Sequence, residues 1–175
     1  MATKTLSNDF MQQIADDAAW KELSGNLSWT EALLEKYQDK VDWQEVSKNR
    51  DILWTVPMLQ KFKHRIYWDK LSECADNDVL TENCIEMFKD KWNWTELSNS
   101  YHFSVTIDLL EKFADYWDWE AIINGCSGDL YSNTNAIEFY ERYKEYIPAA
   151  KLQNSTLWDI IVKQRERQIM AEITA

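Results

Sequence analysis

The histidines and cysteines are the residues best suited to chemistry, and their spacing keeps them apart. His64 and His102 are the only two imidazoles, and they lie much too far apart in the sequence for a two-histidine zinc motif. Cys74, Cys84 and Cys126 are odd in number, and their spacing matches neither a zinc motif nor a disulfide framework. We therefore expect surface or capping histidines, buried reduced thiols and no metal site.

Two further patterns are candidate chemical sites. Gly125 and Gly128 form a GxxG in an expected loop, but the basic residues of a phosphate-binding loop are missing, so an ordinary turn is expected. The 30 acidic residues provide many carboxylate pairs, yet none stands beside a feature that would raise a pKa. The sequence predicts no catalytic residues, no cofactor and no enzymatic activity.

The overall composition favours helices around a substantial core. Only three Gly and two Pro are present, so the turns of a β-sandwich or a nucleotide-binding fold are poorly supplied. Hydrophobic residues make up 45% of the chain, and ten of them are Trp, which are normally used in cores or at binding surfaces. The placement of these Trp residues therefore indicates the architecture.

A short motif built on Trp recurs along the chain. An aliphatic residue follows each of these Trp by three positions, and the spacing from one Trp to the next is nearly constant. The repeated residues are Trp20, Trp43, Trp68, Trp94 and Trp119. A near-constant period of this kind is typical of a tandem repeat protein.

A second signal shares the same period. A Thr or Asn precedes an apolar-periodic run in each copy and is predicted to cap the N-terminus of a helix of about eleven residues. These predicted caps are Thr30, Thr55, Thr81, Thr106 and Asn133. Asp42, Asn93 and Asp118 are predicted to cap a shorter helix that carries the Trp. Each repeat is thus expected to contain two helices.

A helix pair of this size cannot bury its apolar side alone, so each repeat needs its neighbours. The sequence predicts an all-α fold, a short right-handed α-solenoid of about five repeats with the Trp residues packed in its core. A single domain is expected over residues 1–175. Its parts are an N-terminal cap (6–18), repeats at about 19–42, 43–67, 68–93, 94–118 and 119–146, and a C-terminal cap (147–172).

The net charge of −11 is unevenly distributed. Residues 66–145 hold 17 acidic and 6 basic side chains, whereas residues 51–65 carry a charge of +2. This acidity is either a solvated face that maintains solubility or a face that binds a basic partner. The candidate partner-binding face consists of Glu82, Glu86, Asp90, Asp108, Glu111 and Asp115. Clustered Lys and Arg are lacking, which argues against direct binding of nucleic acid or of an anionic membrane.

No secretory signal or long apolar stretch is visible in the sequence. We therefore expect a cytoplasmic protein that does not interact with membranes.

The block from Phe88 to Ser98, echoed from Tyr37 to Ser47 and from Phe113 to Trp119, resembles the short Trp-rich tandem helical repeats found in uncharacterised bacterial and phage proteins. The resemblance covers residues 18–146. It implies a repeat architecture and brings no activity, cofactor or site residues. Tetratricopeptide, ankyrin and HEAT repeats are longer, at about 33–47 residues.

The leading functional prediction is a non-enzymatic protein–protein interaction module or scaffold that uses the solenoid surface. The alternative is a small acidic inhibitor of the phage anti-defence or anti-CRISPR type, which binds a nucleic-acid-processing enzyme and blocks its basic groove. The expected partner in both cases is another protein, and the sequence leaves its identity and the oligomeric state open.

Overall fold

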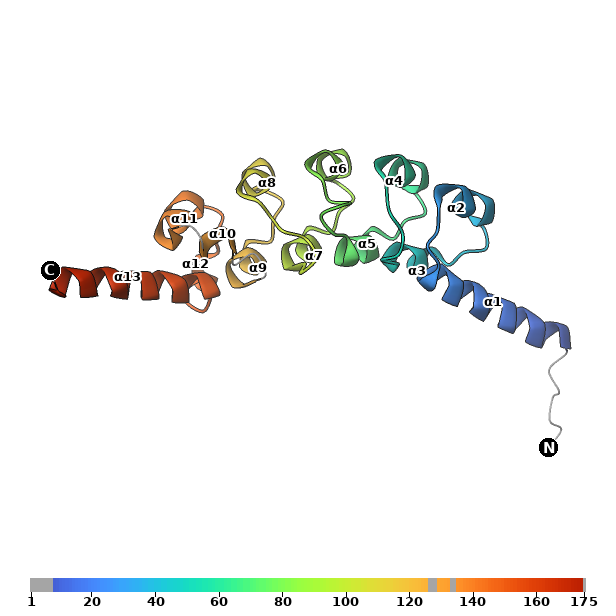
Figure 1. Cartoon of the computed structure of the whole chain (residues 1–175), viewed down its shortest axis with the longest axis horizontal. Helices are drawn as coiled ribbons and strands as arrows, with labels where there is room; N and C mark the ends of the chain where they lie inside the picture. Colours follow the sequence, from blue (N-terminus) through green and yellow to red (C-terminus); the bar gives the residue numbers. More distant parts are fainter. Residues whose placement is uncertain (1–7, 126–128, 133–134, 175) are drawn as a thin grey trace, which may run out of the picture. The chain divides into compact units, whose positions relative to one another are not determined.

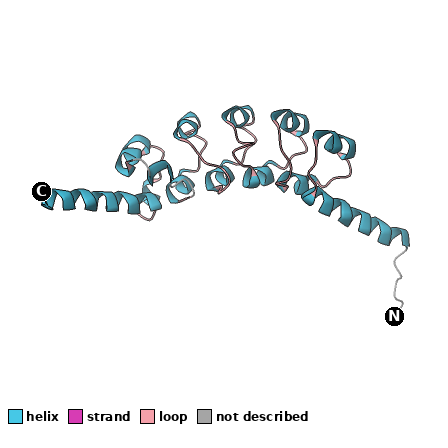
Figure 2. Cartoon of the chain, viewed as in Figure 1, coloured by secondary structure: helices cyan, strands magenta, loops and turns pink. Residues whose placement is uncertain are grey.

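The computed structural model describes residues 8–125, 129–132 and 135–174. Within these ranges all regular structure is helical and no strand occurs (Figure 2), so the prediction of an all-α fold is confirmed. The helices are α1 (Asn8–Asn26), α2 (Glu31–Tyr37), α3 (Trp43–Lys48), α4 (Val56–Phe62), α5 (Trp68–Cys74), α6 (Glu82–Met87), α7 (Trp94–Asn99), α8 (Ile107–Lys112), α9 (Trp119–Asn124), α10 (Asp129–Ser132), α11 (Ala136–Tyr143), α12 (Ala149–Leu152) and α13 (Thr156–Thr174).

The chain divides into two compact units, residues 1–84 and 85–175. In the first unit α3 packs against α1 and α5, and in the second α9 packs against α7 and α13. These Trp-bearing helices are called first helices here, and α2, α4, α6, α8 and α11 are called second helices. Within each unit the two kinds alternate along the chain and form separate layers (Figure 1).

The predicted caps of the second helices are confirmed in four repeats. The side-chain oxygens of Thr30, Thr55, Thr81 and Thr106 each accept a hydrogen bond from the backbone N–H three residues later, at 3.3–3.4 Å. The fifth predicted cap, Asn133, lies outside the described residues. Helix α11 is capped by Asn135, whose side chain accepts the N–H groups of Ile137 and Glu138.

The second helices are shorter than predicted. They contain six to eight residues, so the expected length of about eleven is wrong. In the first repeat the carbonyl of Tyr37 accepts the N–H groups of both Lys40 and Val41, which turns the chain. The next carbonyl, that of Gln38, accepts the indole N–H of Trp43 at 2.8 Å, so the following repeat supplies the partner at this helix end.

The predicted caps of the first helices are also confirmed. The side chains of Asp42, Asn93 and Asp118 accept backbone N–H groups in the first turns of α3, α7 and α9. Tyr67 occupies the same position before α5 and makes no side-chain cap. At the N-terminus, the expected capping helix and the helix of Trp20 form one continuous helix, α1, since good helix formers join them.

The centre of each unit consists of aliphatic side chains at repeated positions. In both units these side chains are at most 1% exposed, so the repeats share one packing scheme. The first unit buries Leu34, Val46, Leu59 and Leu71, and the second buries Ile85, Leu97, Leu110 and Ile122. No described helix combines the length and the apolar character needed to cross a membrane.

Candidate interaction surface

The repeated Trp side chains connect each first helix to the second helix before it. The indole N–H donates to the backbone carbonyl five residues earlier, at 2.8–3.0 Å, in all four described cases. The pairs are Trp43 with Gln38, Trp68 with Lys63, Trp94 with Lys89 and Trp119 with Ala114. Each bond satisfies a carbonyl at a helix end that the helix itself leaves open.

The same Trp rings also pack on the second helix that follows them. Their partner is the aromatic residue at or just after the end of that helix, with ring centroids 5.2–5.5 Å apart. The pairs are Trp20 with Tyr37, Trp43 with Phe62, Trp94 with Phe113 and Trp119 with Tyr143. Trp43 and Trp119 are buried, and the other three repeated Trp are half-buried. These Trp are packing residues between helices, as predicted.

The outer side of the Trp ring is covered differently in the two units. The covering residue always lies three positions after the aromatic residue that packs on that Trp. In the first unit it is a cation, with Lys40 Nζ 5.4 Å from the Trp20 ring centroid and the Arg65 guanidinium 5.9 Å from that of Trp43.

In the second unit the covering residue is a tyrosine. The ring centroid of Tyr116 lies 4.9 Å from that of Trp94, and the ring of Tyr146 stacks on Trp119 at 5.2 Å. Tyr116 and Tyr146 remain 39% and 42% exposed. The second unit therefore presents two aromatic faces where the first unit presents positive charge.

A buried serine hydroxyl joins successive first helices. Ser47 Oγ donates to the Trp43 carbonyl at 2.6 Å and accepts the backbone N–H of Tyr67 at 2.9 Å. Ser24 and Ser98 make the equivalent pair of bonds to Trp20 and Asp42 and to Trp94 and Asp118. The sequence motif contains this serine, but its connecting role was not predicted, because the partner N–H lies in the next repeat.

All six residues of the predicted acidic face are exposed, with Glu82 in the first unit and the other five in the second. Their environments differ. Glu86 lies 3.2 Å from Lys112 and 3.6 Å from Lys89, and the hydrogen bond with Lys112 lowers the pKa of Glu86. Glu111 pairs with Arg142.

Three of the predicted acidic residues lack such compensation. Asp90, Asp108 and Asp115 make no ion pair within the described part of the chain. The predicted face is therefore not one continuous acidic surface, because basic side chains interrupt it at Glu86 and Glu111.

The ion pairs follow the repeat. An acidic residue on one second helix pairs with a basic residue on the next, as in Glu35 with Lys61 at 2.8 Å and Glu86 with Lys112 at 3.2 Å. Just after the helices, Asp39 pairs with Arg65 at 2.8 Å. These pairs were not predicted from the sequence, although opposite charges separated by one repeat period could have indicated them.

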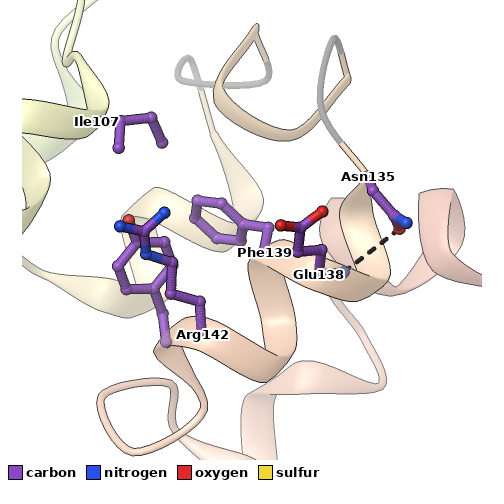
Figure 3. Close-up of a pocket in the computed structure, with 6 residues that line it drawn as sticks. Ile107, Asn135, Glu138, Phe139 and Arg142 are labelled. Atoms are coloured by element: carbon purple, nitrogen blue, oxygen red, sulfur yellow. Dashed lines mark hydrogen bonds between the residues drawn. The ribbon is translucent and has the colours of Figure 1, made fainter.

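A small pocket of about 120 Å³ lies on α11 in the second unit (Figure 3). Ile107, Phe139 and Tyr143 line its apolar part, and the ring of Phe139 lies between the charged ends of Glu138 and Arg142 in this view. Small-molecule sites usually enclose about 300–1,000 Å³. The pocket has room for a single side chain and is too small for a cofactor.

The remaining candidates for chemistry stay separate. His64 and His102 are exposed and belong to different units. Cys74 and Cys84 are free thiols whose pKa values burial raises to about 11, and Cys126 lies outside the described residues. In the described ranges no group of His, Cys, Asp and Glu is arranged to hold a metal ion.

Comparisons of this chain with protein-family models, with curated proteins and with the solved structures find no match. No relative therefore indicates an activity or a partner. The chemistry of the repeat surface is the remaining indication of function.

Proposed function

We propose that this chain is a short right-handed α-solenoid of the Trp-rich repeat type, which binds another protein in the cytoplasm and catalyses no reaction. One observation carries the proposal: the contact of the repeated Trp with the aromatic residue at the helix end recurs in both units, whereas the residue covering the outer side of the Trp ring changes from a cation to a tyrosine. Repeat proteins keep their packing residues constant and present variable positions to partners.

Exposed aromatic side chains support a protein partner. Tyr67 and Tyr101 are 53% and 87% exposed, in addition to the two tyrosines on the Trp rings. Tyrosine is enriched at protein–protein interfaces because it combines a large rigid ring with a polar end. A protein surface is thus a better fit to this chain than a small molecule.

The alternative, an acidic inhibitor that occupies a basic nucleic-acid groove, requires a row of uncompensated charges in place of phosphates. Asp90, Asp108 and Asp115 are suitable for it, whereas Glu86 and Glu111 already have basic partners. The interaction module is therefore favoured. The inhibitor would gain support if neutralising the three aspartates abolished competition with nucleic acid on a target enzyme.

The proposed function is tested by capture of a partner from a lysate of the source cells at physiological salt, using the immobilised full chain. A matched control is the double variant Trp43→Ala and Trp119→Ala, in which the packing between repeats is disrupted. We expect a stoichiometric partner on the intact chain and none on the control. Recovery of the same proteins on both, or of none on either, would contradict the proposal.

A further inference from the structure

We propose that the second unit binds the Arg and Lys side chains of a basic, extended segment of a partner protein. The binding surface, called here the tyrosine–aspartate strip, consists of Tyr116, Tyr146, Asp90 and Asp115. This inference rests on the proposed function and specifies the chemistry of the partner.

The first unit contains an internal example of such binding. The Arg65 guanidinium lies 5.9 Å from the Trp43 ring centroid, 2.8 Å from the Asp39 carboxylate and 3.1 Å from the Gln38 carbonyl oxygen. An aromatic face, a carboxylate and a helix-end carbonyl thus surround one cation. The repeat creates this environment, because Asp39 and Arg65 lie two and three positions after the aromatic residues of successive second helices.

The second unit repeats the aromatic residue and the carboxylate without the cation. Asp90 and Tyr116 occupy the positions of Asp39 and Arg65 in one pair of successive repeats, and Asp115 and Tyr146 occupy them in the next. Both aspartates are exposed and make no ion pair with any described residue, and both tyrosine rings remain partly exposed. A cation from another molecule would complete the arrangement on the outer face of each ring.

The chemistry of the strip selects a basic protein segment. Tyrosine faces attract guanidinium and ammonium groups, and the adjacent carboxylates add charge complementarity and repel phosphates. The two halves of the strip are one repeat apart, and neighbouring packed helices lie roughly 8–10 Å apart. Because a polyproline II chain has three residues per turn and advances about 3.1 Å per residue, two Arg three positions apart lie on the same side of it and should reach both halves.

The test uses the full chain and a fluorescent Gly/Ser peptide that carries two Arg three positions apart, with binding measured by fluorescence anisotropy. The decisive variant combines Tyr116→Lys with Tyr146→Arg, which gives the second unit the cations that the first unit already carries. We expect binding to weaken by about tenfold or more, since two ring contacts are lost and two like charges are added. The basic side chains should be tolerated, because repeats of the first unit have them at these positions.

A matched control places the same two cations elsewhere, as Leu53→Lys with Ile173→Arg, at side chains that are 81% and 74% exposed, and should change the affinity by no more than about twofold. If the decisive variant does not fold, Asp90→Asn with Asp115→Asn decides the question, and it should weaken binding and reduce its dependence on salt. A peptide with Gln in place of Arg should bind weakly or not at all.

The inference is overturned if the unmodified chain does not bind the Arg peptide, or if it binds the Gln peptide equally well. It is also overturned if the strip variants bind the Arg peptide as tightly as the unmodified chain. A captured partner that the strip variants retain fully would overturn the inference and leave the proposed function intact. Failure of the intact chain to capture any protein would instead contradict the proposed function.

Discussion

In the first unit a cation covers the outer side of each described Trp contact, whereas in the second unit a tyrosine covers it. Lys40 and Arg65 lie over Trp20 and Trp43, and Tyr116 and Tyr146 pack on Trp94 and Trp119. The contact of each of these rings with the aromatic residue at the helix end is nevertheless the same in both units, although Trp94 also makes an edge contact with Trp117. The fold therefore depends on the inner contacts, and the outer position is available to set the surface chemistry.

A second difference, between the inner repeats and the last repeat, concerns the serine that joins successive first helices. Ser47 in the first unit and Ser98 in the second have the same pair of hydrogen bonds, but the equivalent position in the last repeat holds the fully buried Ile123. There α9 packs against the long helix α13, and Thr156 Oγ1 donates to the Asn124 carbonyl at 3.1 Å. The connecting hydroxyl is thus present where one first helix packs against the next and absent where α9 packs against the terminal helix α13.

The largest expected effect on stability comes from removing a Trp that packs between helices in the same way in both units. Trp43→Ala and Trp119→Ala should each reduce the free energy of unfolding by about 3–5 kcal/mol, because each leaves a cavity between helices. Urea unfolding followed by circular dichroism measures the loss. Trp20→Ala is the control and should cost less, because Trp20 is only half-buried and its indole N–H has no bond to any described residue. A similar small loss at all three positions would contradict the shared packing scheme.

An intermediate loss of stability is expected when the serines that connect first helices are replaced. Ser47→Ala and Ser98→Ala leave the backbone N–H groups of Tyr67 and Asp118 without their acceptor. Each should reduce the free energy of unfolding by about 1–3 kcal/mol. The exposed Ser28→Ala should change it by less than about 0.5 kcal/mol. If Ser47 mattered and Ser98 did not, the two units would differ in their inner contacts as well as on their surface.

The inner contacts were largely predictable from the sequence, because each depends on a local signal. Thr106 precedes an apolar run and caps α8, and Asp118 precedes Trp119 and caps α9, as their positions indicated. The length of the second helices was not predictable in the same way. The indole of Trp43 bonds to Gln38 only when the next repeat folds back, so the end of α2 depends on a tertiary contact.

The acidic face was predicted less well, because composition does not indicate which acidic and basic side chains form ion pairs. Glu111 was grouped with Asp115 from charge alone, but Arg142 of the following second helix pairs with Glu111 and leaves Asp115 uncompensated. Tyr116 gave no signal as a single residue. Its importance emerged only from its equivalence to Arg65, which the contacts of the two residues with Trp rings reveal.

A smaller effect on stability is expected at a position where the side chains of the second helices differ between the units. Tyr143 corresponds to Phe62 of the first unit, and its hydroxyl donates to Glu111 Oε1 at 3.0 Å. Burial and this hydrogen bond raise the pKa of Tyr143 to about 12, from an ordinary value near 10. Because the folded pKa is raised, this contribution to stability is complete below about pH 10 and is lost as the pH rises towards 12.

Glu111→Gln should therefore lower the pKa of Tyr143, while burial keeps it above the ordinary value. Ultraviolet absorbance titration of tyrosinate, with Tyr143→Phe as the reference that identifies this residue, measures the change. Phe at this position matches the first unit and should fold normally. An unchanged Tyr143 pKa in the Glu111 variant would show that the hydroxyl has another acceptor.

The smallest effect on stability is expected from exchanging the outer residue itself. Arg65→Tyr gives the first unit the covering residue of the second and removes the cation from Asp39. Because Arg65 makes exposed contacts, the free energy of unfolding should change by no more than about 0.5 kcal/mol. The same change in a chain that already carries Tyr116→Lys and Tyr146→Arg should restore part of the binding to the Arg peptide. The reason is that Asp39 and the new tyrosine ring would both be available to an Arg side chain of the peptide. A destabilisation comparable to that of a serine variant would mean that the cation holds the first unit together, and the outer position would then belong to the fold.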